Sequence, residues 1–230
     1  MKIMRRTHVF AFAVASLLAS TSLSAQVVVL DEGAFRLHVN GQPVGTETFS
    51  IRRAGLGNEA ELIAVSQVQY DDGSVIMRPT LNTDASFRPI RYENQVSGTR
   101  ESTVVLALAG RRYTATVVSA QGEAASEFRA APRTLILVPR VATLYYFLSP
   151  FLSEIGSEIS GIEPEDGGRP ALVLTSVAPA QLTIGGQSVA MRLATLQDGS
   201  ATRRIWFDEQ GRVMRVEVPA QNFVAERIQN

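Results

Sequence analysis

The chain has 230 residues, with 22 basic and 22 acidic side chains, two histidines and no cysteine. The lack of cysteine excludes disulfides, thiolate metal sites, thiol catalysis and lipid attachment at an N-terminal cysteine. The balanced charge argues against nucleic acid as a partner, because nucleic-acid-binding proteins present a basic surface.

The first segment, residues 1–25, has the layout of a secretory signal peptide. A positively charged start precedes an apolar run of about eleven residues, Val9–Ala19, and a small, mostly polar stretch follows it. The run is too short to span a bilayer. Cleavage after Ala25 or after Ser24 removes three of the 22 basic residues and leaves 19 against 22 acidic ones. We expect residues 26–230 to form a single β-rich domain that is periplasmic or secreted, and soluble after cleavage.

Turn signals recur through the rest of the chain, among them Asn40-Gly41 and Asp72-Gly73. Between them lie stretches of roughly 8 to 15 residues rich in Val, Ile, Thr, Leu and Tyr, which is typical of antiparallel all-β chains. In residues 35–39 the apolar side chains take one face, while Arg36 and His38 take the other. We therefore predict a mainly β fold, either an antiparallel curved sheet or a barrel or half-barrel.

One segment, Val141–Ile159, has apolar positions at helical spacing. Within it Ser149 precedes Pro150, a residue favoured in a first helical turn. We predict one kinked helix, or a helix pair that meets at this proline, near residues 141–159. The longest apolar stretch of the mature chain, Val138–Ile155, contains charged residues and a proline, so we expect no transmembrane segment.

Catalytic groupings are scarce in the mature chain. His38 is its only histidine, so a serine–histidine–aspartate site would need this residue as the base. The chain has no G-x-S-x-G elbow and no glycine-rich phosphate loop. The carboxylates of Asp71-Asp72 fit a hairpin turn, and those of Glu163–Gly168 fit a solvated loop better than a calcium loop. We therefore predict no enzyme, no catalytic residue, no metal and no cofactor, with a hydrolase built on His38 or on carboxylates as an alternative.

The most distinctive apolar feature is an aromatic stretch inside the predicted helix. Such a helix either buries its side chains in a β core or lines an apolar pocket beneath a curved sheet. A later strand combines a tryptophan with two arginines, which suit either an anionic head group beside such a pocket or a solvated strand edge. The candidate ligand-binding residues are Leu144, Tyr145, Tyr146, Phe147, Phe151, Trp206, Arg203 and Arg204.

Three segments carry a family resemblance. They are Gly41–Phe49, with a G-x-x-x-G hairpin, Leu81–Tyr92, with a D-x-x-x-R-P strand start, and Thr202–Asp208 followed by Gly211–Val213, which forms an aromatic strand and glycine turn. Together they resemble a bacterial family of exported β proteins, domain of unknown function 3108, over about residues 32–218. The resemblance implies an antiparallel sheet curved into a barrel or half-barrel, and no catalytic residues. A looser likeness is to periplasmic lipoprotein carriers, in which a curved sheet and a helical lid enclose acyl chains.

These observations favour a non-enzymatic periplasmic protein that binds a lipid or another hydrophobic ligand in cell-envelope upkeep. The competing hypothesis is a structural or assembly module that binds other envelope proteins through a sheet edge. An unrecognised hydrolase is the third. An enclosed apolar cavity of about 300 Å³ or more would favour the first hypothesis.

Overall fold

The computed structural model describes residues 27–228, most of which lie in β-strands. The strands of the first half are β1 (Val27–Val39), β2 (Gln42–Ala54), β3 (Glu61–Tyr70), β4 (Val75–Asp84), β5 (Pro89–Gly98), β6 (Ser102–Ala109), β7 (Arg112–Ser119) and β8 (Gly122–Arg129). The strands of the second half are β9 (Thr134–Ile136), β10 (Glu158–Ile162), β11 (Ala171–Ile184), β12 (Gln187–Asp198), β13 (Ala201–Phe207), β14 (Val213–Val218) and β15 (Phe223–Ile228). The 3-10 helices among these residues are η1 (Gly57–Glu59), η2 (Thr143–Phe151) and η3 (Pro219–Gln221).

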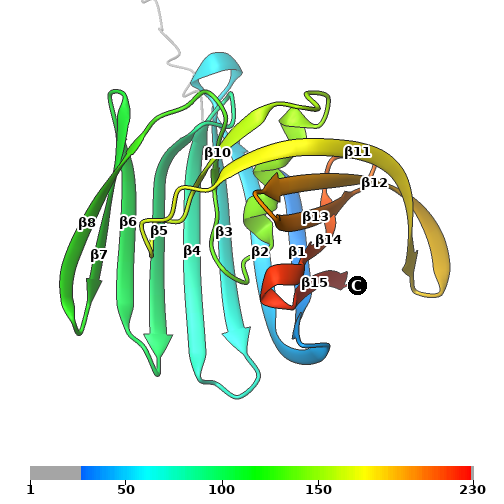
Figure 1. Cartoon of the computed structure of the whole chain (residues 1–230), viewed down its shortest axis with the longest axis horizontal. Coiled ribbons are helices and arrows are strands. Elements are labelled where there is room, and N and C mark those ends of the chain that lie inside the picture. Colours follow the sequence, from blue (N-terminus) through cyan, green and yellow to red (C-terminus); the bar gives the residue numbers. More distant parts are fainter. Residues whose placement is uncertain (1–26, 229–230) are drawn as a thin grey trace, which may run out of the picture.

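All the strands belong to one 15-stranded sheet, in the order β8-β7-β6-β5-β4-β3-β2-β1-β15-β14-β13-β12-β11-β10-β9. Consecutive strands other than β8 and β9 pair with each other, mostly antiparallel, and β1 pairs with β15 to join the two halves of the chain. Among the strands of residues 27–228, only the short β9 runs parallel to its neighbour, β10. The sheet is not closed, because its two ends, β8 and β9, do not pair with each other (Figure 1).

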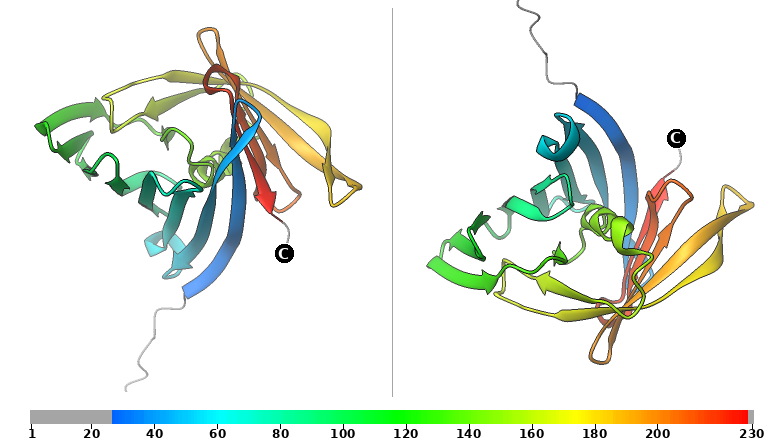
Figure 2. Two further views of the ribbon diagram at one scale, coloured as in Figure 1. Left: turned by 90° about the horizontal axis from the view of Figure 1, so that it is seen from below. Right: turned by 90° about the horizontal axis from the view of Figure 1, so that it is seen from above.

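The sheet curls so that its two halves face each other, and the segment that carries η2 lies inside the curl (Figure 2). In this position η2 contacts β3 on one side and β14 on the other. The inward side chains of both halves pack around it as one apolar core. Strand alternation places these side chains as predicted, since Phe35 and Leu37 are fully buried and Arg36 and His38 are not.

The gap between the two ends of the sheet is bridged by the seam loop, residues 163–169, which follows β10. The Asn94 side-chain amide of β5 donates a hydrogen bond of 2.8 Å to Glu165 Oε1. The Arg169 guanidinium donates one of 2.6 Å to the Glu127 carbonyl oxygen of β8 and lies 5.1 Å from the ring centre of Phe128. Side chains of the seam loop therefore tie the β10 end of the sheet to β5 and to the edge strand β8.

The mainly β, antiparallel, curved fold predicted from the sequence is confirmed, and it takes the open form. The helix is present but shorter than residues 141–159, because it spans nine residues and ends at Phe151. Pro150 lies in its last turn rather than at a kink. Beyond it Gly156 adopts a φ of 85°, outside the helical region, and Glu158–Ile162 pair as strand β10. The predicted signal peptide lies outside the described residues.

Candidate functional site

The aromatic residues of η2 mostly serve the core. Leu144, Tyr145 and Phe147 are buried, while Tyr146 and Phe151 are half-buried. The Phe87 ring, from the turn between β4 and β5, stacks on Tyr146 with 6.3 Å between ring centres. These contacts fix η2 against the first half of the sheet and fill the interior between the two halves.

A buried carboxylate holds the start of η2. Glu47 points inward from β2 and is fully buried. Its carboxylate accepts hydrogen bonds from the backbone N–H of Ala142, at 2.7 Å, and of Thr143, at 3.2 Å. Burial raises the pKa of Glu47, while these two hydrogen bonds oppose the rise. Glu47 therefore satisfies the N–H groups that a helix leaves without intrahelical partners, and it ties η2 to β2.

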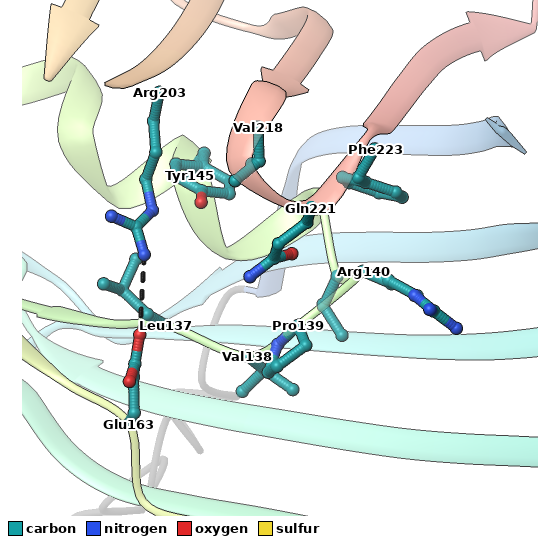
Figure 3. Close-up of a pocket in the computed structure, with 11 residues that line it drawn as sticks. Leu137, Val138, Pro139, Arg140, Tyr145, Glu163, Arg203, Val218, Gln221 and Phe223 are labelled. Carbon is teal, nitrogen blue, oxygen red and sulfur yellow. Dashed lines mark hydrogen bonds and ion pairs between the residues drawn. The ribbon is translucent and has the colours of Figure 1, made fainter. Parts of the chain in front are cut away.

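A small polar pocket lies at one end of the interior (Figure 3). The buried Arg203 guanidinium of β13 contacts Glu163 Oε1 at 3.4 Å and lies beside the Tyr145 hydroxyl. Burial raises the pKa of Tyr145, and the Arg203 charge opposes the rise. The cavity volume is about 10 Å³, enough for one water molecule and far below that of an acyl chain. This pocket is a structural polar contact between η2, β13 and the seam loop.

A second set of buried polar groups lies behind the seam loop. Asn94 and Tyr92 point inward from β5, and both are fully buried. Burial raises the pKa of Glu165, with the hydrogen bond from Asn94 acting in the opposite direction. The pKa of Tyr92 is raised well above its ordinary value, first by burial and then by the Glu165 charge. The seam is therefore closed by a carboxyl group whose burial penalises its charged form.

The raised pKa of Glu165 predicts a pH dependence of stability. A carboxyl whose pKa is higher in the folded than in the unfolded state stabilises the fold below the unfolded pKa, and this contribution is lost as pH rises through the folded pKa. Unfolding by urea should therefore show the wild type losing stability relative to Glu165→Gln as pH rises from about 4 to about 7. The amide keeps the oxygen that accepts from Asn94.

The matched control is Glu123→Gln, at an exposed position of β8. Its unfolding free energy should follow that of the wild type at every pH. Parallel pH profiles for the wild type and Glu165→Gln would contradict the assignment.

The tryptophan and arginine candidates of β13 do not act as one group. Alternation along the strand places Arg203 in the interior and directs Arg204 and Trp206 to the outer face of the sheet. There Arg204 pairs with Glu217 at 3.1 Å, and the Arg215 guanidinium lies 5.5 Å from the Trp206 ring centre. The structure therefore places the two arginines on opposite faces, so they do not form a joint anion site.

A larger hollow lies on the outer face of the first half of the sheet, and we call it the outer groove. Its volume is about 620 Å³, and it is lined by outward side chains of β1, β2, β3 and β4. Val27, Ala54, Ile63 and Val65 supply apolar surface. Val27 is 56% exposed and Val65 49%, unusual values for valines in a strand. This apolar patch has no covering side chains within residues 27–228.

Two arginines lie among these apolar side chains. Arg52 is opposite Ile63 across the β2–β3 pair, so the two share the outer face. Arg78 reaches the groove from β4. Neither arginine forms an ion pair with any residue of the described chain, and no carboxylate lines the groove. The groove therefore combines an apolar floor with uncompensated positive charge, which suits an anionic amphiphile.

Sequence patterns did not reveal this groove. Leu62, Ile63, Ala64 and Val65 are all apolar, so alternation does not separate the buried from the exposed face of β3. A weaker signal was present in the N-terminal part of β1, where three consecutive valines precede a polar segment. The groove emerges only when four strands adopt their register.

The histidine and the carboxylates considered for catalysis do not form one cluster in the described residues. His38 lies half-buried on the outer face of β1, opposite Val224 of β15. In the described part of the chain, no three His, Asp or Glu residues are placed to hold a metal ion. Asp72 lies in the predicted hairpin turn, where its carboxylate accepts a hydrogen bond of 2.9 Å from the Ser74 N–H. Within residues 27–228, no helix is long and apolar enough to cross a membrane.

Comparisons with known proteins give little beyond this description. No family model matches the chain, so the resemblance to domain of unknown function 3108 is not confirmed. No curated protein matches it either. Among solved structures, it is similar to the β-barrel-like protein of domain of unknown function DUF1849 from Brucella abortus. That match has 9% sequence identity and a TM-score of 0.48, and it covers 90% of this chain and 98% of the other. What the chain does is therefore inferred from its own side chains.

Proposed function

We propose that this chain is a non-enzymatic binding protein of the bacterial cell envelope, exported to the periplasm, which holds an anionic amphiphile in the outer groove. The observation that carries this proposal is the pairing of an apolar floor with Arg52 and Arg78 in a hollow of about 620 Å³. This volume lies in the range of ligand pockets, about 300 to 1,000 Å³, and the outer groove is an open hollow rather than an enclosed cavity. The signal-peptide layout of residues 1–25 supports the export.

The interior offers less room for a ligand than the outer groove. Its polar pocket measures about 10 Å³, and η2 fills the space between the two halves of the sheet. A ligand that displaced η2 would break the contacts of Glu47 with Ala142 and Thr143. Neither the candidate residues of η2 nor Arg203 lines the outer groove.

The competing hypothesis is that an envelope protein docks on an edge of the sheet, and the free edges are short. The Arg169 guanidinium donates a hydrogen bond to the Glu127 carbonyl oxygen, so this part of the β8 edge is already covered. The other edge strand, β9, has three residues. These two features reduce the row of free backbone groups that strand addition would use.

Titration with a fluorescently labelled long-chain fatty acid tests the proposal. The wild type should bind one equivalent of the fatty acid saturably. The double variant Arg52→Ala/Arg78→Ala should have a Kd about tenfold higher, because two favourable charge contacts are lost. The matched control, Arg111→Ala/Arg129→Ala, removes two exposed arginines outside the groove and should leave the Kd unchanged. Absence of saturable binding by the wild type, or equal Kd values for both double variants, would overturn the proposal.

A further inference from the structure

The seam loop forms a compact turn between the two ends of the sheet. The Glu163 N–H donates a hydrogen bond of 3.0 Å to the Gly168 carbonyl oxygen, so the loop is closed on itself. At Gly167 the loop lies against Ser126 of β8, whose hydroxyl oxygen would be 3.1 Å from a Cβ atom at this glycine. Because β8 and β9, the two ends of the described sheet, do not pair, the loop can separate from β8 and β5 without breaking a strand pairing between them.

Asn94 and Glu165 form half of the contact that their chemistry allows. The Asn94 amide donates a hydrogen bond of 2.8 Å to Glu165 Oε1, but the buried Asn94 Oδ1 has no hydrogen-bond partner among residues 27–228. An ionised carboxylate only accepts hydrogen bonds, whereas a protonated one also donates one. A proton on Glu165 therefore supplies the donor that Asn94 Oδ1 lacks, so that the acid and the amide can form two hydrogen bonds. A buried acceptor without a donor costs free energy, so the second hydrogen bond stabilises the closed loop.

No opposite charge takes the place of that proton. In the described part of the chain, no ion pair includes Glu165. Arg203 of β13 pairs with another carboxylate of the loop, and Arg169 contacts a carbonyl oxygen of β8. The titratable groups beside Glu165 are Tyr92 of β5, which stays neutral because its pKa is raised well above the ordinary value, and Asp166 of the loop. Burial raises the pKa of Glu165, the hydrogen bond from β5 opposes the rise, and the Asp166 charge adds to it.

We infer that the seam loop is a proton-controlled latch, in which protonated Glu165 pairs with Asn94 and holds the loop to β5. Loss of the proton to solvent removes one of the two hydrogen bonds. Because Glu165 is half-buried, its ionised carboxylate can then turn towards water, which releases the loop and uncovers Ser126. The latch therefore holds at low pH and loosens as pH rises through the folded-state pKa of Glu165. This inference does not depend on the proposed function of the outer groove.

A cysteine placed under the loop tests the latch, since the chain has no other thiol. Ser126→Cys is nearly isosteric, and its reaction with a dithiodipyridine reagent is compared in the wild-type and Glu165→Gln backgrounds at the same pH. This comparison cancels the pH dependence of thiol chemistry. The glutamine amide accepts from Asn94 and donates to it without a titrating proton, so it keeps the loop closed. The two rates should agree at about pH 4, and at about pH 7 the Glu165 background should react about fivefold faster.

Three further variants make the test specific. Val68→Cys places a thiol at a fully buried position of β3, and it should react about tenfold more slowly than Ser126→Cys, because it needs a wider opening of the sheet. Tyr92→Phe should keep the difference between the Glu165 and glutamine backgrounds, and Asn94→Ala should remove it.

The latch is overturned if Ser126→Cys reacts at the same rate in both backgrounds at about pH 7. It is also overturned if Val68→Cys reacts as fast as Ser126→Cys, since the thiol would then be reached by unfolding of the whole sheet. Loss of the difference in Tyr92→Phe would assign the proton to a contact with the tyrosine hydroxyl and overturn the pairing with Asn94.

Discussion

Glu47→Ala is expected to lower the free energy of unfolding by about 3 kcal/mol. The substitution leaves the N–H groups of Ala142 and Thr143 buried without an acceptor, and it opens space beside the start of η2. Each unsatisfied buried donor costs about 1–3 kcal/mol, while removal of a buried carboxyl with a raised pKa returns part of that loss. Urea unfolding followed by circular dichroism measures the difference.

Two further variants make the test specific to capping. Glu47→Gln keeps one oxygen acceptor and should destabilise the fold less than alanine does. Glu61→Ala, at an exposed position of β3, should change stability by less than about 0.5 kcal/mol. If Glu47→Ala unfolded at the same urea concentration as Glu61→Ala, the carboxylate would not be what fixes η2 to the sheet.

The sequence contains a signal for the burial of Glu47. Gly45, Glu47, Phe49 and Ile51 alternate along one strand, which places the glutamate on the same face as two large apolar side chains. A charge in phase with a buried face predicts a paired, buried group. The groups that Glu47 binds could not be predicted from the sequence, because these N–H groups lie 95 and 96 residues away in the chain.

Local patterns predicted the strands and the turns, because their periodicity comes from neighbouring residues. They did not predict how far the sheet closes. That depends on Arg169 and Glu165 meeting β8 and β5, contacts 42 and 71 residues apart in the chain. The same limit explains the helix, whose predicted end was extended into residues that pair with β11 as strand β10.

The candidate ligand-binding residues depend on contacts between distant segments in a similar way. Helical spacing predicts an apolar surface for the aromatic stretch of η2, and this surface packs in the core. Arg203 and Arg204 are adjacent in sequence, yet strand alternation sends them to opposite faces. The outer groove joins residues from four strands, and only their register brings Arg52 and Arg78 to the same apolar patch.

A buried ion pair joins the two halves of the sheet where β1 meets β15. The Arg227 guanidinium binds the Asp31 carboxylate through two hydrogen bonds, of 2.6 and 2.9 Å. It also donates to the Glu32 carbonyl at 2.7 Å, and it lies 5.2 Å from the ring centre of Phe49. The two side chains of the pair are 11% and 3% exposed, so both charges lie largely out of contact with solvent.

Arg227→Leu should therefore cost about 3–5 kcal/mol of unfolding free energy, because it leaves the Asp31 carboxylate buried and unpaired. The double variant Asp31→Leu/Arg227→Leu should lose less unfolding free energy than the two single variants lose in sum, because it removes both charges together. Arg112→Ala breaks an ion pair with Glu127 whose side chains are 69% and 60% exposed, and it should cost less than about 1 kcal/mol. Equal losses for Arg227→Leu and Arg112→Ala in urea unfolding would mean that β1 and β15 are held by strand pairing and apolar contacts alone. A large cost for Arg227→Leu alone would instead show that a charge pair stabilises the junction where β1 and β15 join the two halves of the sheet.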